Sequence, residues 1–478
     1  MLAHTDLAYL ELTEVAELIR SRQTTSLEVT QTILERIETL DPALKSYVTV
    51  MDEVALKAAE QADQEIARGH YRGPLHGVPV AVKDLAYTTD APTGSGTTIH
   101  ANYVSPYDST VVARLREAGA VLTGKLRMTE GAYTDHHPDL PKPVNPWDAD
   151  TWTGVSSSGS GVATAAGFCF GSLGSDTGGS IRLPSSMNGV TGLKPTWGRV
   201  SRYGITELAA SLDHIGPMAR SARDCAAILG VIAGADANDP TASLQPVPDY
   251  LENLRMTRAP RVGIDRTLLA SFDTATQQML TGVIATLEGL GWTVSDIHLP
   301  DLATVSADFA PHCAIETATA HLETYPARAS EYGPALANLI EQGRSLSGID
   351  YQRLLESRRA FTGRMRRTFQ DIDILLMPGI GYASPTLETM STFGSNAGLL
   401  SAVLVPTAPF DFTGQPTITL PGGFSDRGTP LGFQFVGAEF NEQLILQAAH
   451  AYQSVTDFHR THPRLPSEAL PQFAGSAS

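Results

Sequence analysis

Helix and strand signals alternate along this 478-residue chain, and the alternation restricts its fold more than any other feature. Residues 25–37 start with Thr25 and Glu28 in capping-box spacing and continue with apolar residues at helical intervals, which predicts a helix that Pro42 ends. Residues 76–84, HGVPVAVKD, form a short β-branched run after Gly and Pro, which predicts a buried strand that ends at Lys83. Helices and strands in alternation indicate a layered α/β fold.

The same alternation continues to the end of the chain. Small apolar residues at 162–170 predict a tightly packed helix. The strand, helix and strand of a βαβ unit are predicted at 261–265, 274–290 and 292–297. Two further strands and a closing helix are predicted at 417–420, 432–436 and 442–454. Because there are no repeats, charge blocks or long linkers, we expect a single domain over residues 1–465 and a disordered tail over 466–478.

Composition limits the partners and the location of the protein. Lys and Arg number 34 against 51 Asp and Glu, and this net charge of −17 argues against nucleic acid or an anionic membrane surface as a partner. The three cysteines are far apart and fit no disulfide framework. The first residues lack a signal peptide, and no apolar stretch reaches the roughly 18 residues of a membrane span. We therefore expect a cytoplasmic protein without membrane contact.

Several common functional motifs are absent or incomplete. Residues 119–125 have the G-x4-G-K spacing of a phosphate-binding loop, but Leu126 stands where that loop needs a Ser or Thr hydroxyl. The 13 histidines include the pair His136-His137 but no H-E-x-x-H pattern. The G-x-S-x-G turn of serine esterases is also missing. We expect no metal and no cofactor.

A Gly- and Ser-rich stretch at 156–186, SSSGSGVATAAGFCFGSLGSDTGGSIRLPSS, is the strongest functional signal. The Gly-Gly pair before Ser180 lets successive backbone N–H groups converge, so this serine could attack a carbonyl whose oxygen those groups stabilise. Close packing and tight turns are the structural alternative. A serine without histidine can use a lysine that desolvation keeps neutral. Lys83, Lys125 and Lys194 all border apolar runs, so position alone does not choose among them.

These residues resemble the amidase signature family. The segments that carry the resemblance are GVSSSGSG at 154–161 and GSDTGGSIRLP at 174–184. Other similar blocks are GVPVAVKD at 77–84, TGLKPTWGRVS at 191–201, LDHIGPMARSARD at 212–224, and FTGQPTITLPGG with LGFQFVG at 412–437. The resemblance implies a mixed central β-sheet covered by helices on both faces. It also implies a signature core at about 70–225 and a variable substrate-pocket region at about 300–400.

The resemblance further implies a Ser–cis-Ser–Lys triad. Ser180 matches the nucleophile, Ser156 the bridging serine after a cis peptide bond, and Lys83 the general base. The backbone N–H groups that match the oxyanion hole are those of Thr177, Gly178, Gly179 and Ser180. Asp176 and Arg182 match residues that hold this loop. Because Lys83 must be neutral to accept a proton, burial should lower its pKa and activity should rise toward alkaline pH.

The chain departs from the family pattern at one point. The family commonly has Gly-Gly before the bridging serine, whereas this chain has Gly154-Val155 followed by three serines. A register shifted by one residue would make Ser157 the bridge, and we assign Ser156 on its spacing from Ser180.

The function implied by the resemblance is hydrolysis of the C–N bond of a small neutral amide through an acyl-enzyme. Aryl or alkyl amides and anilides are the expected substrates, with carbamates and esters as further candidates, and a homodimer is common in the family. Tyr133 and His136 are candidate substrate contacts, and a solvated loop is the alternative for both. Two other functions stay open, the glutaminase subunit of a tRNA-dependent amidotransferase and a catalytically silent scaffold.

Overall fold

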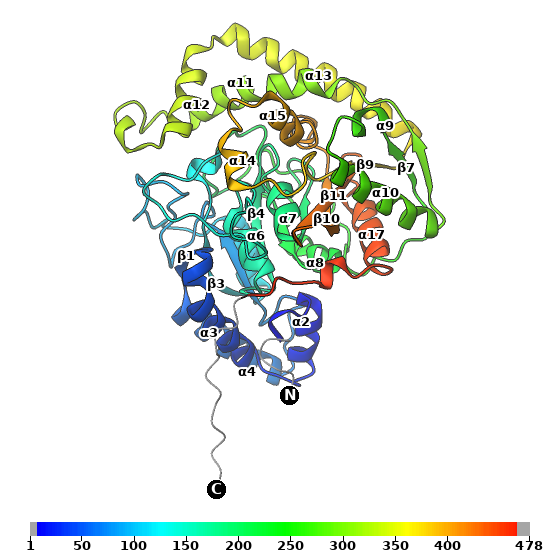
Figure 1. Ribbon diagram of the computed structural model, residues 1–478. Coiled ribbons are helices and arrows are strands. Elements are labelled where there is room, and N and C mark those ends of the chain that lie inside the picture. Colours follow the sequence, from blue (N-terminus) through cyan, green and yellow to red (C-terminus); the bar gives the residue numbers. More distant parts are fainter. Residues whose placement is uncertain (1–6, 466–478) are drawn as a thin grey trace.

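An eleven-stranded mixed β-sheet forms the centre of the computed structural model, which describes residues 7–465 (Figure 1). Its strands are β1 (Tyr47–Val50), β2 (Pro79–Lys83), β3 (Val121–Leu126), β4 (Gly171–Asp176), β5 (Thr191–Lys194), β6 (His214–Ala219), β7 (Arg261–Ile264), β8 (Thr293–Asp296), β9 (Ile374–Pro378), β10 (Thr417–Phe424) and β11 (Pro430–Gly437). They lie in the order β1-β3-β2-β4-β6-β5-β10-β11-β9-β7-β8. β2 runs parallel to β3 and β4, whereas β6 runs antiparallel to β4 and β5.

Helices cover both faces of this sheet. They are α2 (Leu12–Arg20), α3 (Ser26–Leu44), α4 (Asp52–Ala67), α5 (Thr110–Glu117), α6 (Ser158–Ala165), α7 (Arg182–Asn188), α8 (Ala222–Ile232), α9 (Arg266–Leu269), α10 (Thr274–Gly289), α11 (Leu302–Ala320), α12 (Pro334–Ser345), α13 (Gly348–Asp371), α14 (Leu387–Ser391), α15 (Ala397–Leu404), α16 (Ala408–Phe412) and α17 (Glu442–Gln453). α6 packs with α7, and α8 packs with α17. α11, α12 and α13 form an arch along the top of Figure 1. The expected α/β fold is confirmed.

Two helix ends differ from the predictions. The Thr25 hydroxyl accepts the Glu28 N–H as expected, but α3 continues past Pro42. Pro42 lies in the last turn, where its missing N–H removes only one backbone hydrogen bond. The helix predicted at 162–170 instead spans Ser158–Ala165, because Gly167 turns the chain with a positive φ of 72°. The serine-rich loop therefore leads directly into α6, with Ser157 at its N-cap and Ser158 as its first residue.

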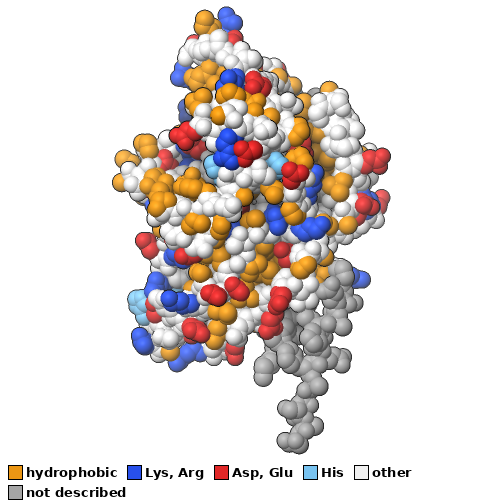
Figure 2. All heavy atoms as spheres, turned by 90° about the vertical axis from the view of Figure 1, so that its left-hand side faces the viewer, with side chains coloured by type: hydrophobic (Ala, Val, Ile, Leu, Met, Phe, Trp, Pro, Cys, Tyr) orange, Lys and Arg blue, Asp and Glu red, His pale blue; other side chains and the backbone are white. Residues whose placement is uncertain are grey.

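The C-terminal predictions are closer to the structure. β7 and β8 run parallel on either side of α10 in sequence, and β10 and β11 form the expected antiparallel pair. The tail predicted at 466–478 lies outside the described residues. None of the helices described between residues 7 and 465 is both long and apolar enough to cross a membrane. Figure 2 shows acidic and basic side chains interspersed over one face of the molecule.

The topology brings two segments of the signature region to one edge of the sheet. β2 ends at Lys83 and its parallel neighbour β4 ends at Asp176. Carboxyl ends of parallel neighbours meet at the same edge, which is where open α/β sheets carry their sites. The turn between Asp176 and α7 contains Ser180. The ends of the neighbouring strands β2 and β4 therefore place Lys83 and this turn at the same edge of the sheet.

Candidate active site

Three serine hydroxyls surround the buried amine of Lys83. Its Nζ lies 2.6 Å from Ser156 Oγ, 3.0 Å from Ser157 Oγ and 2.7 Å from Ser175 Oγ. The lysine side chain comes from β2, two of the hydroxyls from the loop before and at the start of α6, and the third from β4. With Lys83 only 1% exposed, the amine has hydroxyl partners but no direct carboxylate partner within residues 7–465.

Burial lowers the pKa of Lys83 to about 7, and the Asp176 and Asp213 carboxylates oppose that shift only in part. A lysine with this pKa is substantially neutral at physiological pH, unlike a solvated lysine. The lowered pKa is the one expected from the sequence. A neutral amine in contact with a hydroxyl can accept its proton.

The other two candidate lysines have different partners. Lys125 lies 3.3 Å from an Asp84 carboxylate oxygen and donates to Thr93 Oγ1 at 2.7 Å. Lys194 donates to the Gln415 carbonyl at 2.6 Å, and burial lowers its pKa to about 8. Neither lysine has a hydrogen bond to Ser156, Ser157 or Ser175 in the described part of the chain. Of the three lysines, Lys83 contacts the serine cluster.

The serine loop is fixed by its backbone and by α7. The peptide bond between Val155 and Ser156 is cis, as the resemblance implied. Gly154 has a positive φ of 74°, and a Cβ there would lie 2.5 Å from the Pro184 backbone nitrogen. Only glycine combines this conformation with so close an approach. The loop thus lies directly against the first turn of α7.

The next two serines of the loop make different contacts. Ser157 Oγ donates to the Ser175 carbonyl at 3.0 Å and accepts the Ser175 N–H at 3.2 Å. Ser158 Oγ instead lies 3.1 Å from His136 Nε2. Ser158 has no contact with Lys83 among the described residues. Of the three consecutive serines, Ser156 and Ser157 thus reach the lysine.

Ser180 lies in the turn between β4 and α7, beside the serine loop. Its carbonyl accepts the Ser157 N–H at 3.3 Å, which brings the two ends of the Gly- and Ser-rich stretch together. Ser180 is buried but retains 8% exposure, and Gly178 in the same turn is only partly buried. Within residues 7–465, no hydrogen bond joins Ser180 Oγ to Ser156 Oγ.

The amides of this turn are only partly free. The Gly179 N–H donates to Asp176 Oδ1 at 2.7 Å, and Gly179 has a positive φ of 128°. The amides of Thr177, Gly178 and Ser180 have no protein acceptor in the described part of the chain. Of the four amides named as oxyanion donors, three are thus available to a ligand, and their role stays a prediction.

A fully buried cluster of charged side chains stabilises the turn that contains Ser180. The Arg182 guanidinium donates to both Asp176 carboxylate oxygens, at 3.0 and 2.8 Å, to Asp411 Oδ2 at 2.6 Å and to the Thr407 carbonyl at 2.8 Å. Burial would raise the pKa of Asp176, but Arg182 outweighs it and holds that pKa below its usual range. Burial raises the pKa of Asp411 well above its usual range despite Arg182. Arg182 therefore links the turn to α16.

Three residues of this site were missed from the sequence. Ser175 contacts Lys83, Asp411 contacts Arg182, and Asp213 accepts the Thr177 hydroxyl at 2.7 Å. Ser175 lies inside the quoted segment GSDTGGSIRLP, directly before Asp176. Its position in this segment was a signal from which its place in the site could have been predicted. Asp411 comes from α16, far along the chain, and no local pattern pointed to it.

Tyr133 and His136 lie in a loop that contacts the serine loop. The Thr129 N–H donates to the Ser156 carbonyl at 3.2 Å, and the Thr129 hydroxyl donates to the Tyr133 carbonyl. Burial lowers the pKa of His136 to about 4, so its imidazole is neutral at physiological pH. Tyr133 is half-buried and packs against the core. Both residues lie near the site, and their contact with substrate stays a prediction.

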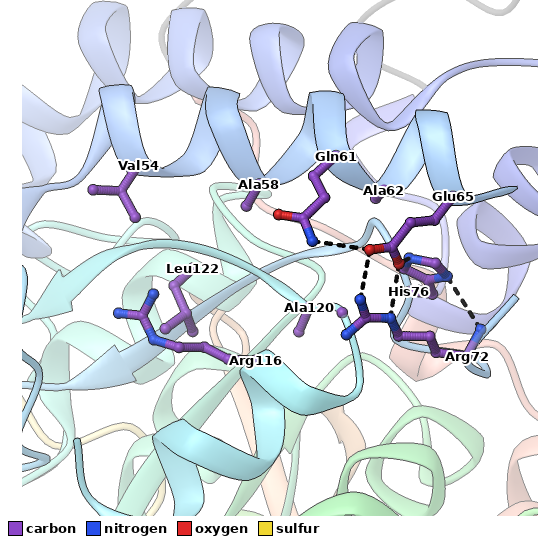
Figure 3. Close-up of a pocket in the computed structure, with 11 residues that line it drawn as sticks. Val54, Ala58, Gln61, Ala62, Glu65, Arg72, His76, Arg116, Ala120 and Leu122 are labelled. Carbon is purple, nitrogen blue, oxygen red and sulfur yellow. Dashed lines mark hydrogen bonds and ion pairs between the residues drawn. The ribbon is translucent and has the colours of Figure 1, made fainter. Parts of the chain in front are cut away.

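A separate hollow of about 150 Å³ lies between α4, α5 and β3 (Figure 3). Glu65 pairs there with Arg72 and His76 and accepts a hydrogen bond from Gln61, whereas Arg116 pairs with Asp90 and Asp108 outside the hollow. The residues that line it include no serine, cysteine or lysine. This hollow therefore offers no nucleophile. Residues 7–465 also contain no cluster of three or more His, Cys, Asp or Glu side chains arranged to hold a metal ion.

Comparison with known proteins identifies relatives of this chain. A family model described as "Amidase" matches residues 28–446. The chain is 60% identical over 454 residues to a Mycobacterium tuberculosis (strain H37Rv) protein named "Putative amidase AmiD", covering 95% of this chain and 96% of that protein. It is 35% identical over 494 residues to a glutamyl-tRNA(Gln) amidotransferase subunit of Carboxydothermus hydrogenoformans, covering 96% of this chain and all of that relative.

Solved structures give the same result. The peptide amidase of Stenotrophomonas maltophilia superposes with a TM-score of 0.83 at 27% identity, covering 96% of this chain and 99% of that one. A 6-aminohexanoate cyclic dimer hydrolase complexed with substrate superposes with a TM-score of 0.87 at 26% identity, with the same coverage of both chains.

Proposed function

The chain belongs to the amidase signature family and is an amidase, and on this basis we propose that Ser180, Ser156 and Lys83 hydrolyse the C–N bond of a small neutral amide. The observation that carries the proposal is the buried Lys83 amine, with a pKa of about 7, in contact with the Ser156 hydroxyl at 2.6 Å. That contact supplies a base for a serine in a site where the sequence offered no catalytic histidine.

Hydrogen-bond accounting favours Ser156 over Ser157 as the bridge. A neutral amine has two N–H donors and one lone pair. The Ser157 hydroxyl already donates to the Ser175 carbonyl, so toward Lys83 it can only accept. If Ser157 and Ser175 accept the two N–H groups, the lone pair is left for the Ser156 proton. Ser156 is thus favoured as the bridge both by its hydrogen bonds and by its spacing from Ser180.

The proposed reaction has two halves. Ser180 Oγ attacks the carbonyl carbon while its proton passes to Ser156, whose own proton passes to Lys83. The free amides of Thr177, Gly178 and Ser180 stabilise the negative oxygen. The C–N bond then breaks, and the proton on Lys83 returns through Ser156 to the leaving nitrogen. Water repeats the sequence on the acyl-enzyme and releases the acid.

Several observations support a neutral amide as substrate. The Phe309 ring lies against the oxyanion turn, because a Cβ on Gly178 would be 2.5 Å from Phe309 Cζ. Apolar side chains also border the serine loop, and an apolar pocket with few polar groups suits an uncharged ligand. One structural neighbour is a peptide amidase by name, and another is a 6-aminohexanoate cyclic dimer hydrolase. A carbamate or ester would fit the same chemistry.

A second function is favoured by one observation. Full-length similarity to an amidotransferase component supports a glutaminase that delivers ammonia within an assembly. The higher identity to a protein named as an amidase favours the free-standing enzyme. Purified alone, a glutaminase subunit should show little amidase activity and should co-purify with other subunits.

The test is a substrate panel of anilides, primary amides, glutamine and carbamates, assayed with wild type and Ser180→Ala. We expect the wild-type protein, purified without partner proteins, to hydrolyse an aryl or alkyl amide. The Ser180→Ala variant should lose nearly all of this activity. Activity confined to glutamine in the presence of a partner would favour the amidotransferase function instead. A Ser180→Ala variant as active as wild type would overturn the mechanism.

A further inference from the structure

Three half-buried apolar side chains border a small hydrophobic cluster beside the serine loop. Val155, Met390 and Phe393 pack against this cluster and remain partly exposed. Its buried members are Trp152, Leu183, Met187, Ile380, Leu399 and Val403. We call these three partly exposed side chains the apolar rim of the cluster, and Val155 directly precedes Ser156 in the chain.

The cluster joins the catalytic turn to α14 and α15. Leu183 lies in the first turn of α7, and a Cβ on Gly179 would be 2.9 Å from Leu183 Cδ1. On the other side, the Trp152 N–H donates to the Pro385 carbonyl at 2.9 Å, which attaches the segment before α14 to the stretch leading to the serine loop. Val155 therefore packs against a cluster that includes Leu183 of α7 and Leu399 and Val403 of α15.

Because Val155 is adjacent to Ser156 in the chain, the part of the substrate that approaches Ser156 is the part that Val155 would contact. In the proposed reaction Ser156 gives a proton to the leaving nitrogen, so that nitrogen must come within hydrogen-bond reach of Ser156 Oγ. We propose that Val155, with Met390 and Phe393, limits the size of the group on the leaving nitrogen. The proposal rests on the proposed function and adds that amides with small, apolar amine portions are the preferred class.

Val155 is the member of the rim that directly precedes the proposed proton carrier Ser156 in the chain. Replacing it by glycine, the residue common at this place in the family pattern described above, removes its three side-chain carbons from the wall. In an apolar pocket, one extra or missing methylene changes the ratio of kcat/KM between two substrates by about 10- to 200-fold. We therefore expect the change to act on the amine portion while the acyl portion is handled as before.

The experiment compares Val155→Gly and Val155→Ala with Val403→Ala, a control at a valine that is 3% exposed inside the same cluster. Substrates are the primary amide, the N-methyl amide and the anilide of one acid, and primary amides of acids of increasing size. We expect Val155→Gly to raise kcat/KM for the anilide relative to the primary amide about tenfold, with Val155→Ala intermediate. Val403→Ala should lower thermal stability and leave this ratio unchanged.

Each other outcome has a defined meaning. If Val155→Gly and Val155→Ala shift the ratio no more than Val403→Ala, or if they shift only the acyl series, the proposal is wrong while the proposed function stands. If Val155→Gly fails to fold by circular dichroism, Val155→Ala against Val155→Thr decides, because threonine keeps the shape and should keep the wild-type ratio. Failure of the proposed function would appear separately, as full activity of Ser180→Ala.

Discussion

The Lys83 amine determines the expected pH dependence at the scale of single residues. Its pKa of about 7 means that it is protonated below this pH and neutral above it. Only the neutral amine accepts a proton, so we expect kcat/KM on a neutral amide to rise through about pH 7 and then level off. Initial rates from about pH 5 to 10 measure this, and a flat profile between about pH 6 and 10 would argue against Lys83 as the base.

The contacts of the two adjacent serines predict unequal effects of removing them. Ser156→Ala removes the proposed proton carrier, so kcat should fall at least about 100-fold, the usual contribution of a positioned acid–base group. Ser157→Ala removes a hydroxyl that only accepts from Lys83, and kcat should fall about tenfold or less. Steady-state kinetics on one amide compares them. The reverse order would make Ser157 the bridge.

Single residues also show how far the sequence could go. The Gly-Gly-Ser180 turn could be predicted because the residues that define it are adjacent in the sequence. The choice among Lys83, Lys125 and Lys194 needed either the family resemblance or the structure, because all three border apolar runs. Asp411 was not predictable from the sequence, since it reaches Arg182 only through the packing of α16 against the turn.

At the scale of elements, Arg182 joins α7, the end of β4 and α16. Its guanidinium binds Asp176, Asp411 and the Thr407 carbonyl, and both of its carboxylate partners are fully buried. Removing a buried charge leaves its partners without compensation, which costs about 3–5 kcal/mol. We therefore expect Arg182→Met to lower the free energy of unfolding by about that amount, measured by urea denaturation.

The matched control is Arg366→Met on the exposed side of the molecule. Arg366 pairs with Glu439 at 2.9 Å, but its side chain is 63% exposed. Exposed pairs contribute at most about 1 kcal/mol, so this variant should unfold near the wild-type urea concentration. Equal stability of the two variants would show that Arg182 does not hold these elements together.

Elements were predictable where local signals were complete. The β7–α10–β8 unit and the β10–β11 pair followed from periodicity and turn residues. Helix ends were less certain. Pro42 did not stop α3 because the last turn tolerates a missing N–H, and Gly167 ended α6 earlier than its run of small residues suggested.

At the scale of the whole molecule, we propose that residues 7–465 form one cooperative unit. β5 from the signature core pairs with β10 from the C-terminal part, so the two halves of the chain share one sheet. Separate unfolding of either half would expose sheet that the other covers. Far- and near-ultraviolet circular dichroism in urea should therefore report one coincident transition, and two separated transitions would contradict a single domain.

The most direct test of the account is the identity of the acylated residue. Wild-type enzyme mixed with an activated aryl ester of a small acid, quenched during turnover and analysed by intact and peptide mass spectrometry, should carry the acyl mass on Ser180. Ser180→Ala should carry none and should lose its amidase activity. An acyl group on another residue, or a Ser180→Ala enzyme that still turns over amide at the wild-type rate, would contradict the proposed mechanism.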